Sequence, residues 1–347
     1  MTTTPTPMKP WKATKKERAT DISIFFLALL SSYAVVAVTP MKGKLAIFVV
    51  FFLVYMLMTS SIKGFQLGSA AAKDALVNSL VAFGAIVTVI PIAIILFTVV
   101  QKGLPGISLN LFLSDMSMAT PTDPLNNGGL LHAITGTLAL VTLALIMSVP
   151  IGILTALYLT EIKGKFTAPI RFLVQAMSGV PSIVAGLFIL SAILYPITKS
   201  FSGFLGALAL TILMIPTIAR TSEEVLNLIP NDLREAGVAL GGTQWRTVAM
   251  IVLPAAKSGL ITAVILGVAR IAGETAPLLL LTGGGDKVNA NAFSGPLGSL
   301  PYYIWKSFNA GSPEAITRAW AGLLVLMVLV LLLFMAARSL SSRKISK

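Results

Sequence analysis

The sequence predicts an all-α integral membrane protein, and three observations support that prediction. Hydrophobic residues make up 56% of the 347 residues and charged residues 11%, whereas a soluble domain carries about 25% charged residues. The apolar residues gather in runs with lengths near the roughly 20 residues that a helix needs to cross a bilayer. Most of the 26 Lys and Arg residues lie at the ends of these runs. The net charge of +13 therefore indicates membrane topology and not a nucleic-acid partner.

The apolar runs predict eight spans, arranged as an N-terminal hairpin followed by a core. After a basic tail at residues 1–21, runs at 22–38 and 45–59 predict a two-helix transmembrane hairpin, residues 22–59. A signal peptide is the alternative for the first run, but no small-x-small cleavage pattern closes it. A core of about six transmembrane helices is expected over residues 75–337, with runs at 75–100, 131–159, 172–195, 203–218, 257–281 and 319–337. A second basic tail occupies residues 338–347.

Thiol and metal chemistry are not expected in this chain. It has no cysteine, so it forms no disulfide. Its single histidine, His132, begins an apolar run. One histidine without neighbouring ligands makes no metal site, so His132 is expected to be structural.

The distribution of Lys and Arg predicts which side of the membrane each loop occupies. With the N-terminus inside, most positive charges fall on the inner side, and this places both termini in the cytoplasm. The same distribution places residues 219–256 in the cytoplasm, in a segment longer than the other inner loops. Its pattern predicts a helix, the pair Gly241-Gly242, and a second helix that Leu253-Pro254 closes.

Two interpretations are open for the segment 219–256: a solvated connector, or a docking element for another protein. Its apolar side chains are unfavourable on a water-facing loop unless a partner covers them. These side chains are Trp245, Val248, Met250, Ile251 and Leu253. The sequence therefore favours a docking element.

A charged pair lies within the apolar run 257–281. Arg270 and Glu274 are four residues apart, so on one helix they share a face and can pair. A charge at the bilayer centre costs about 2.5–3.5 kcal/mol on insertion scales, and charges kept at that depth are usually functional. The pair is therefore interpreted as part of a substrate pathway. The alternative is an ion pair that only locks two helices together.

The segment EAGVALGGTQWRTVAMIVLP, residues 235–254, resembles the cytoplasmic loop of permeases in bacterial binding-protein-dependent ABC importers. The residues that fit the pattern of that loop are Glu235, Ala236, Gly241, Ile251, Leu253 and Pro254. Gly237 replaces the third small residue of the pattern and is expected to change little. The resemblance implies a coupling helix that docks a separate ATPase subunit. The sequence carries no G-x-x-x-x-G-K-[ST] phosphate loop, so ATP and Mg are expected to be used by that partner.

A second resemblance lies in ARIAGETAPLLL, residues 269–280, which is similar to the PstA family of phosphate importer permeases. That family has a type I transmembrane domain of the CysTW-like subfamily. Three further segments agree with it, at residues 179–188, 216–226 and 233–241. The resemblance covers residues 75–337, with the type I segment at about 132–337, and leaves the hairpin unexplained. The sister PstC family has a similar Arg and Glu-Thr pairing but continues with a different run.

The resemblance implies a permease subunit, not an enzyme, of an ATP-driven inorganic phosphate importer in the bacterial plasma membrane. It implies as partners a second, PstC-like permease, two PstB-like ATPase subunits and an extracytoplasmic, PstS-like phosphate-binding protein. No cofactor is expected in this chain. A permease for another oxyanion, such as sulfate or molybdate, is one alternative. An ion-coupled secondary carrier is another, but it predicts an internal repeat that the sequence does not display.

Phosphate chemistry suits the charged pair. The fork of Arg270 matches the oxygens of an oxyanion, and Glu274 compensates its charge at rest. Gly273 allows a close approach, and Pro277 leaves the Gly273 carbonyl without a donor, which distorts the helix. The resemblance implicates Arg220 together with Arg270 in phosphate passage. The alternative for Arg220 is an ordinary positive-inside anchor at the inner end of its span.

Overall fold

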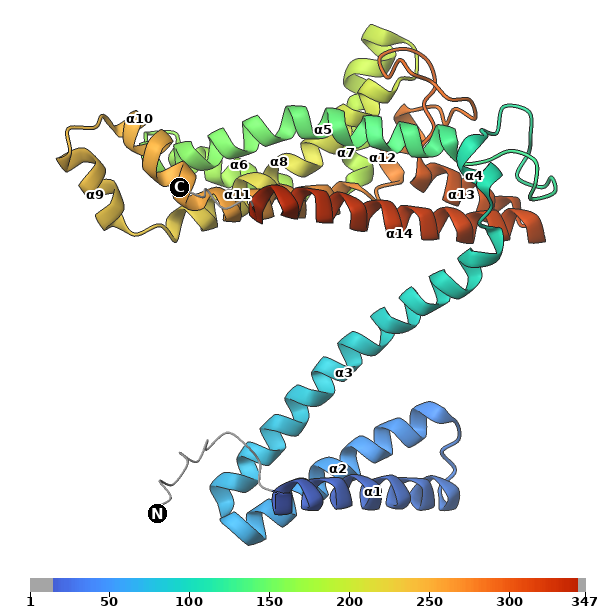
Figure 1. The fold of residues 1–347 in the computed structure, drawn as a ribbon, viewed down its shortest axis with the longest axis vertical. Coiled ribbons are helices and arrows are strands. Elements are labelled where there is room, and N and C mark those ends of the chain that lie inside the picture. The colour runs from blue at the N-terminus through green and yellow to red at the C-terminus, as the bar shows by residue number, and fades with distance from the viewer. Residues whose placement is uncertain (1–14, 343–347) are drawn as a thin grey trace, which may run out of the picture. The chain divides into compact units, whose positions relative to one another are not determined.

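The computed structural model describes residues 15–342, so the predicted basic tails, 1–21 and 338–347, lie partly outside the described residues. The chain divides between Leu96 and Phe97 into two compact units. The division falls inside one long helix, α3 (Ser69–Gly103), which therefore contributes to both units. The ribbon in Figure 1 is built from helices joined by loops.

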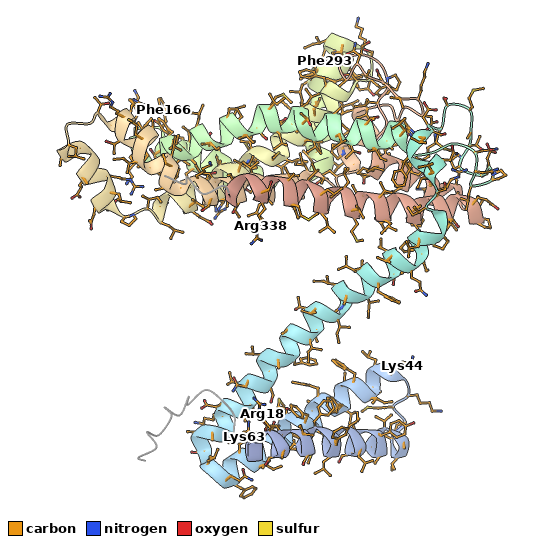
Figure 2. All side chains as sticks on the ribbon, viewed as in Figure 1. Arg18, Lys44, Lys63, Phe166, Phe293 and Arg338 are labelled. Atoms are coloured by element: carbon orange, nitrogen blue, oxygen red, sulfur yellow. The ribbon has the colours of Figure 1, made fainter. Side chains whose placement is uncertain are left out.

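The first unit contains the N-terminal hairpin, whose two apolar runs form helices as predicted. These are α1 (Lys15–Val38) and α2 (Lys44–Leu67), each longer than the run that predicted it. Ala28 of α1 is fully buried, and so small a side chain lets a neighbouring helix approach closely. Lys63 of α2, which is labelled in Figure 2, pairs with Asp21 of α1 at 3.6 Å. The two helices of the hairpin thus pack against each other.

Four long helices run side by side in the second unit (Figure 1): α5 (Leu131–Leu157), α8 (Gly203–Asn227), α11 (Leu253–Ile271) and α14 (Pro313–Ser342). Two glycines bring α8 close to its neighbours. A Cβ atom added to Gly152 of α5 or to Gly267 of α11 would lie 2.7 or 2.9 Å from the side chain of Ile218 of α8. Small residues at such contacts are how membrane helices reach close packing. The central core therefore forms where these three helices meet.

Shorter helices occupy both ends of this bundle and the region beside it. One end, called here the α9 end, carries η2 (Tyr158–Ile162), α9 (Asn231–Ala239), α10 (Gln244–Thr247) and η4 (Val248–Val252). The opposite α13 end carries η1 (Leu104–Gly106), α4 (Leu109–Leu113) and α13 (Leu300–Ala310). The remaining elements are α6 (Thr167–Ser178), α7 (Ser182–Ile189), η3 (Leu190–Thr198) and α12 (Ala276–Leu281). Of the η elements, η1 is a 3-10 helix and the other three are π-helices.

Within residues 15–342, seven helices are long and apolar enough to cross a membrane, or eight if a bent pair counts as one span. The bent pair replaces the single span predicted at 172–195. It consists of α6 and of α7 continued by η3, which meet at 104°. The bend falls at Pro181, which has the extended backbone angles φ −60° and ψ 140°. Proline also disfavours a helical conformation in the residue before it, so α6 cannot continue straight into α7.

Two other predicted boundaries were wrong. The run at 203–218 continues as α8 to Asn227, so the segment 219–256 begins inside that helix. Pro254 does not close the second helix of the segment but lies in the first turn of α11. Proline is well placed there, because the first-turn N–H groups of a helix have no partner in the helix anyway. The span predicted at 257–281 is also not a single helix. It consists of the end of α11 and the whole of α12, with a break between them.

A buried arginine holds the loop at the α13 end. Arg318 of α14 has an exposed fraction of 1%, and its Nη2 atom donates hydrogen bonds to the carbonyl oxygens of Asp123, Pro124 and Asn127. Three carbonyl dipoles thereby face a charge that would otherwise be buried without compensation. In the same loop the Ser117 hydroxyl donates to Asp115, and this bond holds the pKa of that carboxyl below its usual value. The loop is therefore fixed by polar contacts and by the burial of Met116 and Leu130 in an apolar cluster with residues of α13 and α14.

Candidate functional site

The segment between α8 and α11 has the predicted order of helix, glycine pair and helix. α9 ends at Ala239 because Gly241 adopts the left-handed φ of +83° that only glycine takes readily. α10 then begins after Thr243, whose hydroxyl accepts a hydrogen bond from the amide of Arg246. The glycine pair is thus a hinge of defined geometry between two short helices.

Gly237 has a larger role than the sequence suggested. It is the buried residue of α9, where it packs against α10 and η4. A Cβ atom added to Gly237 would lie 2.6 Å from Cγ2 of Thr247 and 2.8 Å from Cδ1 of Ile251. Atoms at those separations overlap, so with a third alanine at this place either these side chains or α9 would have to shift. Gly237 therefore has a packing role that the sequence did not predict.

The apolar side chains of the segment divide into a covered set and an uncovered set. Val248 and Val252 are buried in a cluster with residues of α5, α8 and α11, so they need no partner protein. This corrects the expectation that Val248 needs a partner protein to cover it. Leu240, Trp245 and Met250 are 87%, 61% and 68% exposed. An apolar surface of this kind at the end of a bundle is typical of a docking site.

The other residues that fit the coupling-loop pattern surround this surface. Glu235 and Ala236 are exposed on α9, Ile251 and Leu253 are half-buried, and Pro254 is exposed at the start of α11. Glu235 also lines a cavity of about 780 Å³ between α9, α10 and the end of α5. The pattern residues are thus distributed over one end of the bundle.

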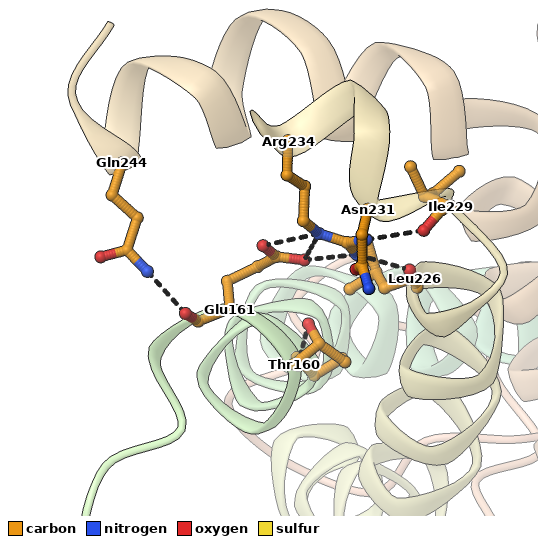
Figure 3. A network of polar contacts seen from close by, with 8 residues as sticks. Thr160, Glu161, Leu226, Ile229, Asn231, Arg234 and Gln244 are labelled. Carbon is orange, nitrogen blue, oxygen red and sulfur yellow. Dashed lines mark hydrogen bonds and ion pairs between the residues drawn. The ribbon is translucent and has the colours of Figure 1, made fainter. Parts of the chain in front are cut away.

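The same cavity contains an ion pair that the sequence did not reveal. Arg234 of α9 contacts Glu161 of η2, with Nη2 and Nε donating to the carboxylate at 2.9 and 3.1 Å (Figure 3). The arginine donates in addition to the carbonyl oxygens of Ile229 and Leu226, at 2.6 and 2.8 Å. Gln244 of α10 donates to the Glu161 carbonyl oxygen at 2.6 Å. Glu161 and Arg234 are 73 residues apart, so no local pattern pairs them.

The predicted charged pair forms, but not on one helix. Nη1 of Arg270 donates to Oε1 of Glu274. Arg270 is in the last turn of α11, which ends at Ile271, and Glu274 lies in the turn that follows. Ile271 belongs to the central core together with Ala144 of α5 and Met214 of α8, so the break is near the middle of the bundle. The Arg270 side chain is 43% exposed and the Glu274 side chain 13%.

The helix distortion predicted at Gly273 and Pro277 is a complete break. Gly273 lies between α11 and α12 and is exposed, and among the described residues no atom beyond its two chain neighbours lies within 4 Å of an added Cβ. Pro277 is buried in the first turn of α12. A Cβ atom on Gly186 of α7 would lie 2.9 Å from Cα of Pro277, so α7 and α12 are in close contact. The two segments 179–188 and 269–280 therefore meet here.

Arg220 lies inside α8, which continues to Asn227, and it is exposed. It lines a cavity of about 250 Å³ with Glu223 and Glu224 of the same helix and Arg171 of α6. Nη2 of Arg171 pairs with Glu223 at 2.7 Å. The helices that carry Arg220 and Arg270, α8 and α11, pack against each other.

In the described part of the chain, no group of three or more His, Cys, Asp or Glu side chains is placed to hold a metal ion. His132 is 2% exposed, and its ring lies edge-on to that of Tyr303 at 5.8 Å between centroids. Burial raises the pKa of the Tyr303 hydroxyl above its usual value.

Comparisons with known proteins identify the family to which this chain is similar. Residues 148–346 match the family described as binding-protein-dependent transport system inner membrane component. The phosphate transport system permease protein PstA of Pasteurella multocida is 42% identical over 246 residues, which cover 70% of this chain and 85% of that protein. PstA of Haemophilus influenzae is 41% identical over 244 residues, 69% of this chain and 84% of that protein. PstA 1 of Mycobacterium tuberculosis is 39% identical over 211 residues, 60% of this chain and 69% of that protein.

The family match spans the bent pair and the whole segment with its glycine hinge. The identity to each relative is above 30%, and the matched region covers more than two thirds of each relative's length. The chain is accordingly a multi-pass membrane protein with the fold of a type I ABC importer permease. It belongs to the family of binding-protein-dependent transport system inner membrane components, and within that family to the PstA permeases.

Proposed function

We propose that this chain is the membrane permease subunit of an ATP-driven inorganic phosphate importer and forms half of its translocation pathway. The observation that carries the proposal is the pair of Arg270 and Glu274 at a helix break in the middle of the bundle. The relatives at about 40% identity are named phosphate transport permeases, which supports phosphate as the substrate.

The chemistry of the break suits an oxyanion. An arginine offers up to five N–H donors in a planar fork, and phosphate oxygens match that geometry. Arg270 is 43% exposed on the surface of the isolated chain, so its remaining donors are accessible to a substrate. Glu274 lies beside it and offsets its charge when no substrate is present. Gly273 leaves open space at the same place.

The family match and the names of the relatives support the partners of this subunit. The exposed side chains of Leu240, Trp245 and Met250 form the surface that docks an ATPase subunit. Two PstB-like ATPase subunits hydrolyse ATP with Mg, and this chain itself holds no cofactor. A PstC-like permease forms the other half of the pathway, and a PstS-like protein delivers phosphate from outside. Both termini and the segment 219–256 are cytoplasmic, and the membrane is the bacterial plasma membrane.

The test is phosphate uptake by the assembled complex. The four subunits are co-expressed, purified and reconstituted in liposomes with ATP on the side of the ATPase. Radiolabelled phosphate uptake that needs both ATP and the binding protein is the expected result. Sulfate or molybdate in excess leaves this uptake unchanged if phosphate is the substrate. Uptake of either competitor in place of phosphate would overturn the substrate assignment.

Docking is tested separately with two variants of the segment. Gly241→Val places a branched side chain at a φ of +83° and distorts the hinge. Glu235→Lys reverses the charge of an exposed residue that fits the coupling-loop pattern. Both variants are expected to insert in the membrane but to lose uptake and the co-purified ATPase. Normal uptake in both would remove the segment as the docking site.

A further inference from the structure

We propose that Arg234 and Glu161 are positioning residues that fasten the docking helix α9 to the ends of two transmembrane helices. Through this contact, movement of α9 by the ATPase is passed to α5 and α8. The inference deepens the proposed function and rests on it for the identity of the ATPase. The geometry of the contact stands on the structure alone.

α9 has few other means of attachment. Gly237 is the buried residue among the nine of the helix, and the side chains around it are exposed. Glycine contributes no side chain, so the packing at Gly237 fixes the separation of α9 from η4 but supplies little hydrophobic stabilisation. The long side chain of Arg234, 22% exposed, is therefore the principal polar link between α9 and the bundle.

The Arg234 guanidinium contacts two helices at once. Its Nε and Nη2 atoms bind the carboxylate of Glu161, which is 8% exposed in the π-turn that ends α5. Its Nη1 and Nη2 atoms bind the carbonyl oxygens of Ile229 and Leu226, where α8 ends. Carbonyl groups at a helix end lack partners in the helix and carry partial negative charge, so a cation is favoured there. One side chain thus joins α9, α5 and α8.

The second half of the segment meets the same residue. Nε2 of Gln244 in α10 donates to the backbone carbonyl oxygen of Glu161 at 2.6 Å (Figure 3). Glu161 therefore contacts α9 through its side chain and α10 through its backbone carbonyl oxygen. A displacement of either helix acts on the end of α5, which packs along the length of α8. A solvated connector would not need two links to the same residue, one to its carboxylate and one to its backbone carbonyl oxygen.

The first experiment measures coupling in the assembled complex. Glu161→Gln keeps the shape of the side chain but removes its charge, and Arg234→Lys keeps the charge but loses the fork. In each variant the phosphate taken up per ATP hydrolysed is expected to fall about tenfold, the effect of losing one charge-assisted hydrogen-bonded pair. ATP hydrolysis itself continues. The matched control is Asp286→Asn, which breaks the 2.6 Å ion pair with Lys306 at the opposite end of the unit.

The second experiment measures the position of α9 without any partner. The natural sequence has no cysteine, so Asp232→Cys in the exposed first turn of α9 gives a single site for a spin label. In the full-length chain in lipid nanodiscs, Glu161→Gln and Arg234→Lys are each expected to increase the mobility of this label. Asp286→Asn is expected to leave it unchanged. If Glu161→Gln fails to accumulate in the membrane, Arg234→Lys alone decides the question.

The two measurements separate this proposal from the proposed function. Unchanged label mobility, or uptake per ATP equal to that of Asp286→Asn, overturns the role of Arg234 and Glu161. A wild-type complex that takes up no phosphate contradicts the proposed function, and the spin label still decides whether Arg234 holds α9.

Discussion

Two of the Arg–Glu pairs in this protein have the same chemistry and different surroundings. Arg270 and Glu274 are four residues apart at a helix break, and the arginine side chain is 43% exposed. Arg234 and Glu161 are 73 residues apart, and the arginine side chain is 22% exposed. Within the described residues, Arg270 donates from Nη1 to its partner, whereas Arg234 donates from all three of its nitrogens. A guanidinium with free donors can take a ligand, and a saturated one can only hold structure.

The two pairs also differ in the space around a neighbouring glycine. Gly273 lies between Arg270 and Glu274, and an added Cβ there meets nothing within 4 Å. Gly237 is three residues after Arg234, and an added Cβ there overlaps the side chain of Thr247. The open space beside Arg270 and Glu274 leaves room for a substrate. The crowding beside Arg234 and Glu161 indicates that helix α9 is held in place there.

The largest effect is expected when Arg270 is removed. Arg270→Gln takes away both the positive charge and the planar fork of donors that match an oxyanion. Two charge-assisted hydrogen bonds are worth about 3 kcal/mol or more, so uptake should fall roughly 100-fold. Arg270→Lys should recover part of it, because an ammonium keeps the charge. The measurement is phosphate uptake normalised to folded protein, and normal uptake by Arg270→Gln would reduce the pair to a helix lock.

The next largest effect is expected from exchanging the two residues. Arg270→Glu combined with Glu274→Arg keeps the net charge and allows the same ion pair. The cation moves from the last turn of α11 into the following turn, a displacement of about 6 Å if the rise of a helix is applied. We expect a complex that assembles and does not transport. An active double variant would mean that the pair acts as a structural contact, as Arg234 and Glu161 do.

The local features of the fold were largely predictable from the sequence. Apolar runs located the helices, the spacing of Arg270 and Glu274 indicated an ion pair, and the glycine hinge at Gly241 was expected. Such features depend on residues within a few positions of one another, and helical periodicity and glycine conformation suffice to infer them. The break after Ile271 was foreseen only as a distortion, because proline signals a weakened helix but not how far the chain departs from it.

The long-range features were not predictable from one sequence. Nothing near Glu161 indicates that Arg234 meets it, and nothing near Gly237 indicates that Thr247 crowds it. The course of the chain through residues 172–195 depends on how α7 packs against α12, which Pro181 alone does not determine. One signal was present, since Arg234 immediately precedes the coupling-loop pattern at Glu235. Its importance is clear only when its partner is known.

A moderate effect is expected at Gly273, where space is open. Gly273→Ala adds a methyl group that meets no atom of this chain, so folding and ATPase docking should be normal. Uptake should fall several-fold if substrate or the second permease passes close to this backbone. The matched control is Gly84→Ala, because Gly84 of α3 also has nothing within 4 Å of an added Cβ. Equal, normal uptake in both variants would show that nothing approaches Gly273.

The smallest effect is expected at Gly237, where space is filled. Gly237→Ala brings a methyl group to 2.6 Å from Cγ2 of Thr247 and 2.8 Å from Cδ1 of Ile251, so either these side chains or α9 must shift. Overpacking of this kind costs about 1 kcal/mol or somewhat more, while the gain in helix propensity offsets part of that cost. The side chains of Thr247 and Ile251 can move slightly, so uptake should fall only a few-fold.

The cause of that loss is distinguished by a second substitution on the facing helix. Thr247→Ser removes the Cγ2 atom that lies closest to the added methyl group and leaves a hydroxyl that can rotate. Combined with Gly237→Ala, it should restore both the uptake per ATP and the low mobility of a spin label at residue 232. Ala236→Gly serves as the opposite control, because it weakens α9 through propensity at an exposed position without crowding. If Thr247→Ser gives no recovery, then the Gly237 contact does not set the position of α9, and Arg234 holds the helix without it.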